Sequence, residues 1–192
     1  MIESRNIILA SQSQRRIELL KLLRLENIEI ENHKVDEENF KWKKPYSKSI
    51  LDLSELKARS IQNKKNKNSI IIAGDTVVIR AGKLLNKTNS TTKIKSYLET
   101  LSGRKHFVYG GLCVLSPSGK AFKKFSKTEV YFNKIYDYEI TKQVLEDGVG
   151  KAGGYALQNF GSRFVKKIRG CYTNVIGMSI PELYKILKNP EL

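Results

Sequence analysis

An aspartate interrupts the most apolar run of the chain. The run reads IIIAGDTVVI, and Asp75 lies near its centre. A carboxylate inside such a strand is costly unless it is paired, hydrogen-bonded or bound to a metal. One explanation is purely structural: the strand could break at Gly74, and Asp75 would then be an ordinary turn residue. We prefer a functional one, because titratable groups in apolar surroundings are common in active sites.

A second carboxylate would complete a site for a hard metal ion. Glu37 and Glu38, in the loop VDEENF, could bring that carboxylate to Asp75. Hard oxygen ligands without a neighbouring His or Cys suit Mg²⁺ or Mn²⁺ and not zinc. His33 and His106 are each isolated from a second His or Cys at ligand spacing, which argues against a zinc site.

Two arginines follow two serines in the first strand-to-helix turn. Ser11 and Ser13 occupy positions typical of helix N-caps, and Arg15 and Arg16 fall in the first helical turn. Cations there oppose the helix macrodipole, at a cost of about 0.3–1 kcal/mol each. A bound phosphate would make the two arginines favourable instead of costly, because backbone N–H groups, hydroxyls and guanidiniums all bind an anion. Two solvated arginines on a surface helix explain this stretch equally well.

The stretch GKAGGYALQ, residues 150–158, is bare enough for a ligand to approach its backbone. It has the spacing of neither a P-loop nor a Rossmann fingerprint. Lys151 and Gln158 flank its glycines. Elsewhere Lys57, in SELKARS, and Lys87, in KLLNKT, are single lysines that exposure to solvent would explain. Alone, each of these features indicates a nucleotide only weakly.

Five motifs taken together are far more specific. SxSxRRxELL, GDTVV, LSGRKH, GKAGGYALQ and CYTNVIGMSIPELYKIL occur in the order, and at about the spacing, of the Maf family, septum-formation-inhibitor-like nucleoside triphosphate pyrophosphatases. The chain resembles this family from about Ile7 to Leu187. The resemblance implies a metal-dependent enzyme that cleaves nucleoside triphosphates to the monophosphate and pyrophosphate. GCYTNVIGM looks most like the dTTP and UTP subfamily, and less like the one that acts on 7-methyl-GTP.

The resemblance also implies roles for single residues. Asp75 matches the proton acceptor, and Glu37 most nearly matches a second acidic residue, so the two would hold Mg²⁺ or Mn²⁺. Asp75 would activate water for attack at the α-phosphorus, while cations meet the charge that develops on pyrophosphate. The matching substrate-binding positions are Ser11, Arg15, Arg16, Lys57, Lys87 and Gln158.

Three positions depart from the residues usual in the family. Gln14 stands where proline follows the second serine, Asn86-Lys87-Thr88 replaces glycine-lysine-proline, and Gly110-Gly111 replaces threonine-glycine. None of these changes removes a charged residue of the expected site. They affect loop geometry, on which rate and substrate preference depend.

Net charge is the outlying property of the composition. It is +16, with a sequence pI near 9.8, and lysine runs occur at 39–48, 62–68 and 122–127. Such a surface attracts nucleic acid, membrane headgroups or small polyanions, although solvated loops also explain it. Aromatic residues among the lysines keep a nucleic-acid-binding module open as an alternative function. A nucleotide-binding regulator of cell division is a further alternative.

The rest of the composition is typical of a soluble, cytoplasmic protein. The chain has 192 residues, 40% of them hydrophobic, and no segment approaches the roughly 18 consecutive apolar residues of a membrane span. Its start lacks the long apolar region of a secretion signal. Cys113 and Cys171, both in apolar settings, are expected to be buried free thiols, which fits a reducing compartment. The family resemblance also implies that the protein forms a homodimer.

Helices that alternate with strands must position these residues. Apolar patterns predict strands at 5–10, 26–35, 69–80, 83–87, 106–116, 121–132, 164–168 and 173–177, and helices within 11–25 and at 49–62, 89–103, 137–147 and 180–188. This order predicts one domain, residues 1–192, of the mixed α/β or α+β class. The resemblance implies an elongated mixed β-sheet flanked by helices, two lobes with a central cleft, and a relation to the inosine triphosphate pyrophosphatase fold.

Overall fold

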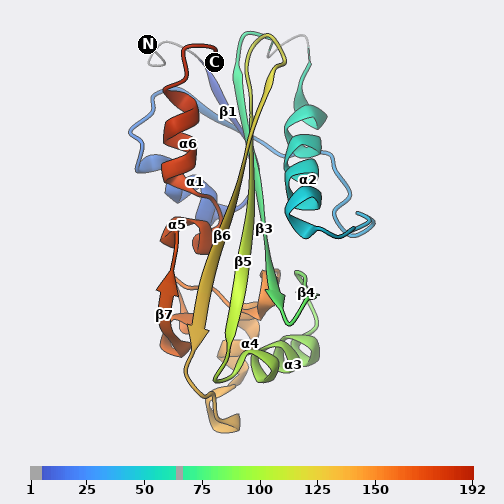
Figure 1. The fold of residues 1–192 in the computed structure, drawn as a ribbon, viewed down its shortest axis with the longest axis vertical. Coiled ribbons are helices and arrows are strands. Elements are labelled where there is room, and N and C mark those ends of the chain that lie inside the picture. The colour runs from blue at the N-terminus through green and yellow to red at the C-terminus, as the bar shows by residue number, and fades with distance from the viewer. Residues whose placement is uncertain (1–5, 64–66) are drawn as a thin grey trace. The chain divides into compact units, whose positions relative to one another are not determined.

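The computed structural model describes residues 6–63 and 67–192, so part of the lysine run at 62–68 lies outside the described residues. Seven strands form one sheet with the order β2-β1-β3-β5-β6-β7, and β4 pairs with β3 (Figure 1). The strands are β1 (Ile7–Ala10), β2 (Ile28–Glu31), β3 (Ile70–Arg80), β4 (Lys83–Leu85), β5 (Lys105–Leu115), β6 (Ala121–Phe132) and β7 (Val165–Arg169).

Helices flank this sheet. They are α1 (Gln14–Lys21), α2 (Tyr46–Ile61), α3 (Thr91–Leu101), α4 (Lys142–Gly148), α5 (Tyr172–Ile176) and α6 (Ile180–Leu187), with 3₁₀ turns η2 (Asp137–Glu139), η3 (Ala152–Gly154) and η4 (Phe160–Phe164). β1 runs parallel to β2 and β3, whereas β4 and β7 run antiparallel to β3 and β6. The expected α/β class, with a mixed sheet flanked by helices, is therefore confirmed.

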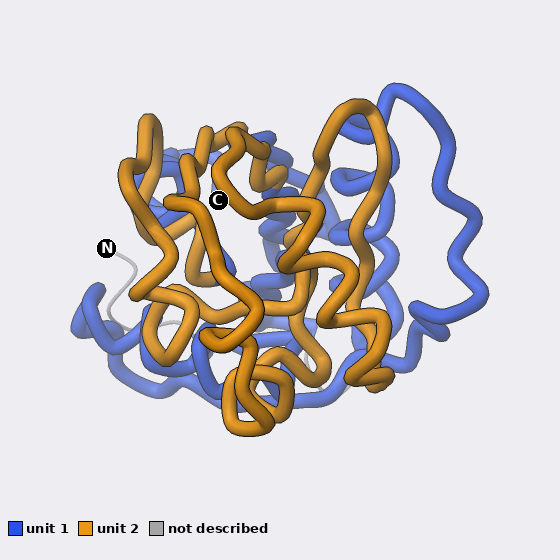
Figure 2. The backbone as a smooth tube through the Cα atoms, turned by 90° about the horizontal axis from the view of Figure 1, so that it is seen from below, with its two compact units in different colours: residues 1–75, 110–126, 177–192 blue, residues 76–109, 127–176 orange. Residues whose placement is uncertain are grey.

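The chain folds into two compact units, shown in separate colours in Figure 2. Unit 1 contains residues 1–75, 110–126 and 177–192, and unit 2 contains residues 76–109 and 127–176. Each unit is therefore assembled from segments that are distant in the sequence. The single domain and the cleft between two lobes stay predictions.

The core of unit 1 packs helix α2 closely against the sheet. Ala58 and Ile61 of α2 share a buried cluster with apolar residues of β1, β3 and β5. A Cβ atom added to Gly111 of β5 would lie 2.4 Å from the carbonyl oxygen of Ile50 and 2.6 Å from Ser54 Oγ. Only glycine at this position lets α2 approach so closely. Because α2 also carries Lys57, this contact positions a residue of the expected site.

The core of unit 2 forms around helix α3. Ile94, Leu98 and Leu101, predicted to face inward, are all 0% exposed. The helix begins after Ser90, whose side chain accepts a hydrogen bond from the backbone N–H of Lys93, as the Ser/Thr-rich start predicts. The cluster continues over the buried faces of β5 and β6.

Three predicted elements differ in the structure, and one of them, the helix predicted at 137–147, divides into η2 and α4. The segment 173–177, predicted as a strand, belongs mostly to helix α5. Its Asn174 is buried, and Nδ2 donates to the Val108 carbonyl oxygen at 3.2 Å and to Thr128 Oγ1 at 3.1 Å. These tertiary hydrogen bonds outweigh the strand preference of its β-branched residues. The strand predicted at 26–35 shortens to the four residues of β2.

The two cysteines differ in burial. Cys113 is buried, as expected, and its burial raises the pKa of its thiol to about 12. Cys171 is only partly buried, so the expectation of a core position is wrong for this residue. Within residues 6–63 and 67–192, no helix is long and apolar enough to cross a membrane.

Candidate active site

Asp75 lies in β3 with 2% of its surface exposed, and it is paired with two cations. Its Oδ1 atom lies 3.3 Å from Nη2 of Arg16 and 3.3 Å from Nζ of Lys57. The buried carboxylate thus has the partners that its position demands. All three residues belong to unit 1.

Arg16 is turned back from the first turn of α1 and is 6% exposed. Its Nε donates to the carbonyl oxygen of Gly177 at 3.0 Å, and its Nη1 donates to Ser11 Oγ at 3.2 Å. Ser11 Oγ also accepts from the backbone N–H of Ser13 at 3.2 Å. A solvated surface arginine is therefore the wrong interpretation for Arg16, although Arg15 is partly exposed.

Lys57 is 0% exposed, so solvent exposure does not explain this lysine. Besides Asp75, its Nζ lies 2.7 Å from Oε1 of Glu37. The same Glu37 oxygen lies 3.1 Å from Nε2 of His33. Glu38 is exposed, so the geometry favours Glu37 as the second carboxylate of this cluster.

The loop around Glu37 is stiffened by its neighbour Asp36. Oδ1 of Asp36 accepts the backbone N–H groups of Glu38 at 3.1 Å and Asn39 at 3.2 Å, and Oδ2 accepts the Asn39 amide at 2.7 Å. The bonds from Asn39 contribute most to a lowered pKa of Asp36. This local turn fixes the backbone from which the Glu37 side chain extends.

The cluster of Arg16, Lys57, Asp75 and Glu37 carries two positive and two negative formal charges, which cancel. A nucleoside triphosphate bears close to four negative charges, so the cluster needs further cations to bind one. Arg15 is a candidate within unit 1, and a divalent metal ion is another.

Asp75 and Glu37 offer the oxygen ligands that such a metal prefers. Among residues 6–63 and 67–192, no group of three or more His, Cys, Asp or Glu side chains is arranged to hold a metal. Mg²⁺ typically binds one or two carboxylates and completes its shell with water and substrate phosphates. The two carboxylates meet at one ammonium, that of Lys57. The donor set therefore fits a metal that shares its ligands with a bound nucleotide.

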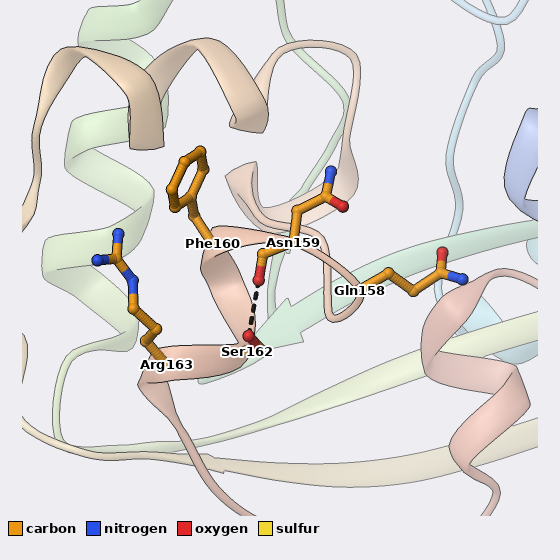
Figure 3. Close-up of a pocket in the computed structure, with 5 residues that line it drawn as sticks. All are labelled: Gln158, Asn159, Phe160, Ser162 and Arg163. Carbon is orange, nitrogen blue, oxygen red and sulfur yellow. Dashed lines mark hydrogen bonds between the residues drawn. The ribbon is translucent and has the colours of Figure 1, made fainter.

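The other two expected site residues, Lys87 and Gln158, belong to unit 2, and both are exposed. Gln158 borders a hollow of about 460 Å³, whose other lining residues are Asn159, Phe160, Ser162 and Arg163 (Figure 3). Ser162 Oγ donates to the Asn159 carbonyl oxygen at 2.7 Å, and the Arg163 guanidinium lies 5.0 Å from the centre of the Phe160 ring. In Figure 3, Gln158 points away from the side on which Phe160 and Arg163 lie.

Two glycines of the stretch 150–158 are closely packed against neighbouring side chains. Gly153 and Gly154 have φ angles of 70° and 73°. An added Cβ would lie 2.8 Å from Val78 at the first and 3.0 Å from Ile94 at the second. The bareness that was expected to admit a ligand is thus required here by neighbouring side chains and a left-handed backbone.

A buried polar pair fixes the same stretch to β5. Tyr155 Oη and His106 Nε2 lie 2.8 Å apart. Burial raises the pKa of Tyr155, and burial together with the charge of Arg80 lowers the pKa of His106 to about 3. His106 is therefore a neutral structural histidine near pH 7.

Sequence reasoning missed two contributors to the unit 1 cluster. The Gly177 carbonyl group that holds Arg16 lies 161 positions away in the chain, and nothing in the side-chain pattern indicates it. His33 was considered only as a zinc ligand. Its position four residues before Glu37 was the available signal.

A buried carboxylate between an arginine and a lysine, beside parallel strands of an α/β sheet, is typical of enzymes that handle anionic ligands. A model of the Maf-like protein family matches residues 6–190, and the chain belongs to this family.

Curated relatives in this family resemble the chain over nearly its full length. The dTTP/UTP pyrophosphatase of Clostridium perfringens strain SM101 is 36% identical over 188 residues, which are 97% of each chain. The dTTP/UTP pyrophosphatase of Clostridium botulinum strain Okra is 39% identical over 187 residues, 95% of this chain and 96% of the relative.

Among solved structures, the Ham1 protein of Staphylococcus aureus aligns with 96% of this chain and 98% of its own. The TM-score is 0.49 and the sequence identity is 13%.

Proposed function

We propose that this protein is a metal-dependent nucleoside triphosphate pyrophosphatase that hydrolyses dTTP and UTP to the monophosphate and pyrophosphate. The names of its relatives support the reaction and the substrates. The single observation that carries the proposal is the buried Asp75 carboxylate, 3.3 Å from both Arg16 and Lys57. An aspartate so placed combines a base with cations that can neutralise phosphate.

In the proposed mechanism Asp75 accepts a proton from the water that attacks the α-phosphorus. Arg16 and Lys57, which offset the carboxylate in the absence of substrate, lie where they can also stabilise negative charge on phosphoryl oxygens. Ser11 holds the guanidinium of Arg16. Arg15 and Lys87 supply further positive charge to the triphosphate, and Gln158 offers an amide to the nucleotide.

Asp75 and Glu37 would hold the divalent cation, Mg²⁺ or Mn²⁺, together with phosphate oxygens of the substrate. A bound cation would neutralise phosphate charge and polarise a phosphoryl oxygen. The zero net charge of the four-residue cluster supports this requirement, because the cluster alone does not balance a triphosphate. Lys57 must then share the two carboxylates that it contacts.

The test is product analysis with purified protein, with and without Mg²⁺ or Mn²⁺, against dTTP, UTP, the other common triphosphates and 7-methyl-GTP. We expect metal-dependent release of pyrophosphate and a monophosphate, fastest with dTTP and UTP. The Asp75→Asn variant keeps the shape of the side chain and should lose this activity. Release of inorganic phosphate, or full activity in Asp75→Asn, would contradict the proposal.

One observation favours a second candidate, binding of single-stranded nucleic acid. On β5, β6 and β7 of unit 2, cations lie over aromatic rings, with Lys127 Nζ 4.3 Å from the Phe107 ring centre and the Arg169 guanidinium 5.8 Å from that of Tyr131. Bases stack on such rings while phosphates meet such cations. A gel shift that weakens steeply with salt would support it, whereas the pyrophosphatase itself does not require nucleic acid.

A cytoplasmic location, a homodimer and a role in septum formation or division control accompany the proposal. They are supported by the composition and by the family resemblance. Gel filtration with light scattering is the direct test of the dimer.

A further inference from the structure

His33 contacts the cluster in unit 1 without belonging to the residues expected there. Its Nε2 lies 3.1 Å from Oε1 of Glu37, and this oxygen is also 2.7 Å from Lys57 Nζ. One carboxylate oxygen thus receives both the imidazole and the ammonium. Lys57 in turn contacts Asp75 at 3.3 Å, so the imidazole is connected to the buried carboxylate through Glu37 and Lys57.

The polar atoms of His33 are not placed as fold stability alone would place them. An ionised carboxylate only accepts hydrogen bonds, so Nε2 must carry the proton that faces Glu37. The other ring nitrogen, Nδ1, is buried and has no partner among the residues that the structure describes. A buried polar atom without a partner costs stability, and a leucine would avoid that cost. The contact of Nε2 with Glu37 is the compensating interaction.

The backbone beside His33 is anchored to the helix that carries Lys57. The N–H of Lys34 donates to Ser60 Oγ at 3.0 Å, and that hydroxyl donates to the Lys57 carbonyl oxygen at 2.8 Å. The backbone next to His33 is therefore tied to the Lys57 turn of α2. Glu37, by contrast, has a long side chain that is 29% exposed. Without a second partner it gains rotamer freedom by turning to solvent.

We propose that His33 is a positioning residue that holds the Glu37 carboxylate toward Lys57 and Asp75, in the orientation that binds the divalent cation. The inference rests on the proposed function for the role of Glu37. Hydrogen-bond partners of metal-binding carboxylates typically contribute about 10–100-fold to metal affinity or activity.

The test compares two substitutions at this position. His33→Leu fills the space but donates no hydrogen bond, whereas His33→Gln keeps an N–H donor at the distance of Nε2. We expect His33→Leu to lower kcat for dTTP about 10–100-fold with a smaller change in KM, and His33→Gln to restore most of it. Because Leu also removes the unpartnered Nδ1, the melting temperature of His33→Leu should equal or exceed that of the wild type. Lys34→Leu, an exposed neighbour, is the matched control and should behave as the wild type.

Binding of Mn²⁺ to the full chain, followed by electron paramagnetic resonance, provides a readout that does not depend on turnover. His33→Leu should weaken Mn²⁺ affinity and His33→Gln should retain it. A His33→Leu variant with wild-type kcat and Mn²⁺ affinity overturns the inference. So does an equal loss in both variants together with a lower melting temperature, which identifies a purely structural histidine. If the wild type cleaves no triphosphate, the proposed function fails and the Mn²⁺ comparison alone decides the role of His33.

Discussion

Each buried charge in the unit 1 cluster is held by more than one partner. Asp75 meets Arg16 and Lys57, and Arg16 also bonds the Gly177 carbonyl group and the Ser11 hydroxyl. Removing one partner of a buried ion pair leaves the other charge uncompensated, which is far more damaging than losing a surface pair. The residues proposed for binding and catalysis therefore also carry part of the stability of unit 1.

Arg16→Ala tests this double role. We expect kcat/KM to fall sharply and the free energy of unfolding to drop by about 3–5 kcal/mol, because Asp75 loses one of its two cations while buried. Enzyme assays and urea unfolding measure the two effects. Arg16→Lys keeps the charge and should lose less stability. Arg15→Ala, which is partly exposed, should change stability by about 0.5 kcal/mol or less. An Arg16→Ala variant with unchanged kcat/KM would place Arg16 outside the site.

Single residues could be predicted from the sequence where they conflict with their surroundings. Asp75 stands out because a carboxylate is costly in an apolar strand. Arg16 was ambiguous, since Asp75 and Gly177, two of its three partners, lie 59 and 161 positions away. Lys57 resembled a solvated lysine, but Leu53 and Ile61, four residues before and after it, are both buried, so helical spacing was the signal that could have placed it on the core face of α2. The family motifs supplied those positions, and the pairing itself became visible only in three dimensions.

At the scale of elements, helix α2 depends on Gly111, the glycine of the usual threonine-glycine pair that this chain keeps, whereas Gly110 is the departure. Gly111 follows Gly110 where threonine-glycine is usual, and it lies directly against the backbone of α2. The approach of helix to strand at this point decides how far Lys57 reaches toward Asp75.

Gly111→Ala should therefore disturb both packing and the site. Its Cβ would lie 2.4 Å from the Ile50 carbonyl oxygen, so α2 has to move. We expect a loss of about 1–3 kcal/mol in the free energy of unfolding, measured in urea, together with reduced activity from a displaced Lys57. Ser54→Ala is the control, because it changes the same contact by removing a hydroxyl and adds no bulk. Stability equal to wild type in Gly111→Ala would show that the contact is not tight in solution.

Elements with a clear apolar stripe were predictable, and those set by tertiary hydrogen bonds were not. Helices α2, α3 and α6 appear close to their expected ranges, because their periodic apolar residues face a core. Segment 173–177 has β-branched residues and reads as a strand, but the side-chain bonds of Asn174 to β5 and β6 favour a helix. The acceptors of these bonds lie 66 and 46 positions away in the chain, so the local sequence does not indicate them.

At the scale of the whole molecule, stability depends on pH through His106. Its pKa in the folded state is lowered to about 3, from an unfolded value near 6.5. The unfolded chain therefore binds more protons, and the contribution of neutral His106 is complete above about pH 6.5. It is lost progressively as the pH falls from 6.5 toward 3.

Urea unfolding at pH 7 and pH 5 measures this dependence. Between about pH 6.5 and 5 we expect His106 to remove up to about 2 kcal/mol, at about 1.4 kcal/mol per pH unit. The double variant His106→Phe/Tyr155→Phe removes both polar atoms of the pair. Its free energy of unfolding should therefore not show the decrease with falling pH that His106 causes. Tyr155→Phe alone keeps the histidine and should still lose stability as the pH falls. Equal pH dependence in the wild type and the double variant would assign the acid sensitivity to other groups.

The hydrogen bond from Arg16 to Gly177 also has a consequence for biosynthesis. The donor is translated 161 residues before the acceptor. At about 5–20 residues per second, the interval is on the order of ten seconds. During this time Arg16 has no native carbonyl partner, and the third segment of unit 1 does not yet exist. The site is thus completed only late in translation, because a nascent chain stalled before residue 177 carries the charged side chains of the cluster but lacks the Gly177 acceptor of Arg16.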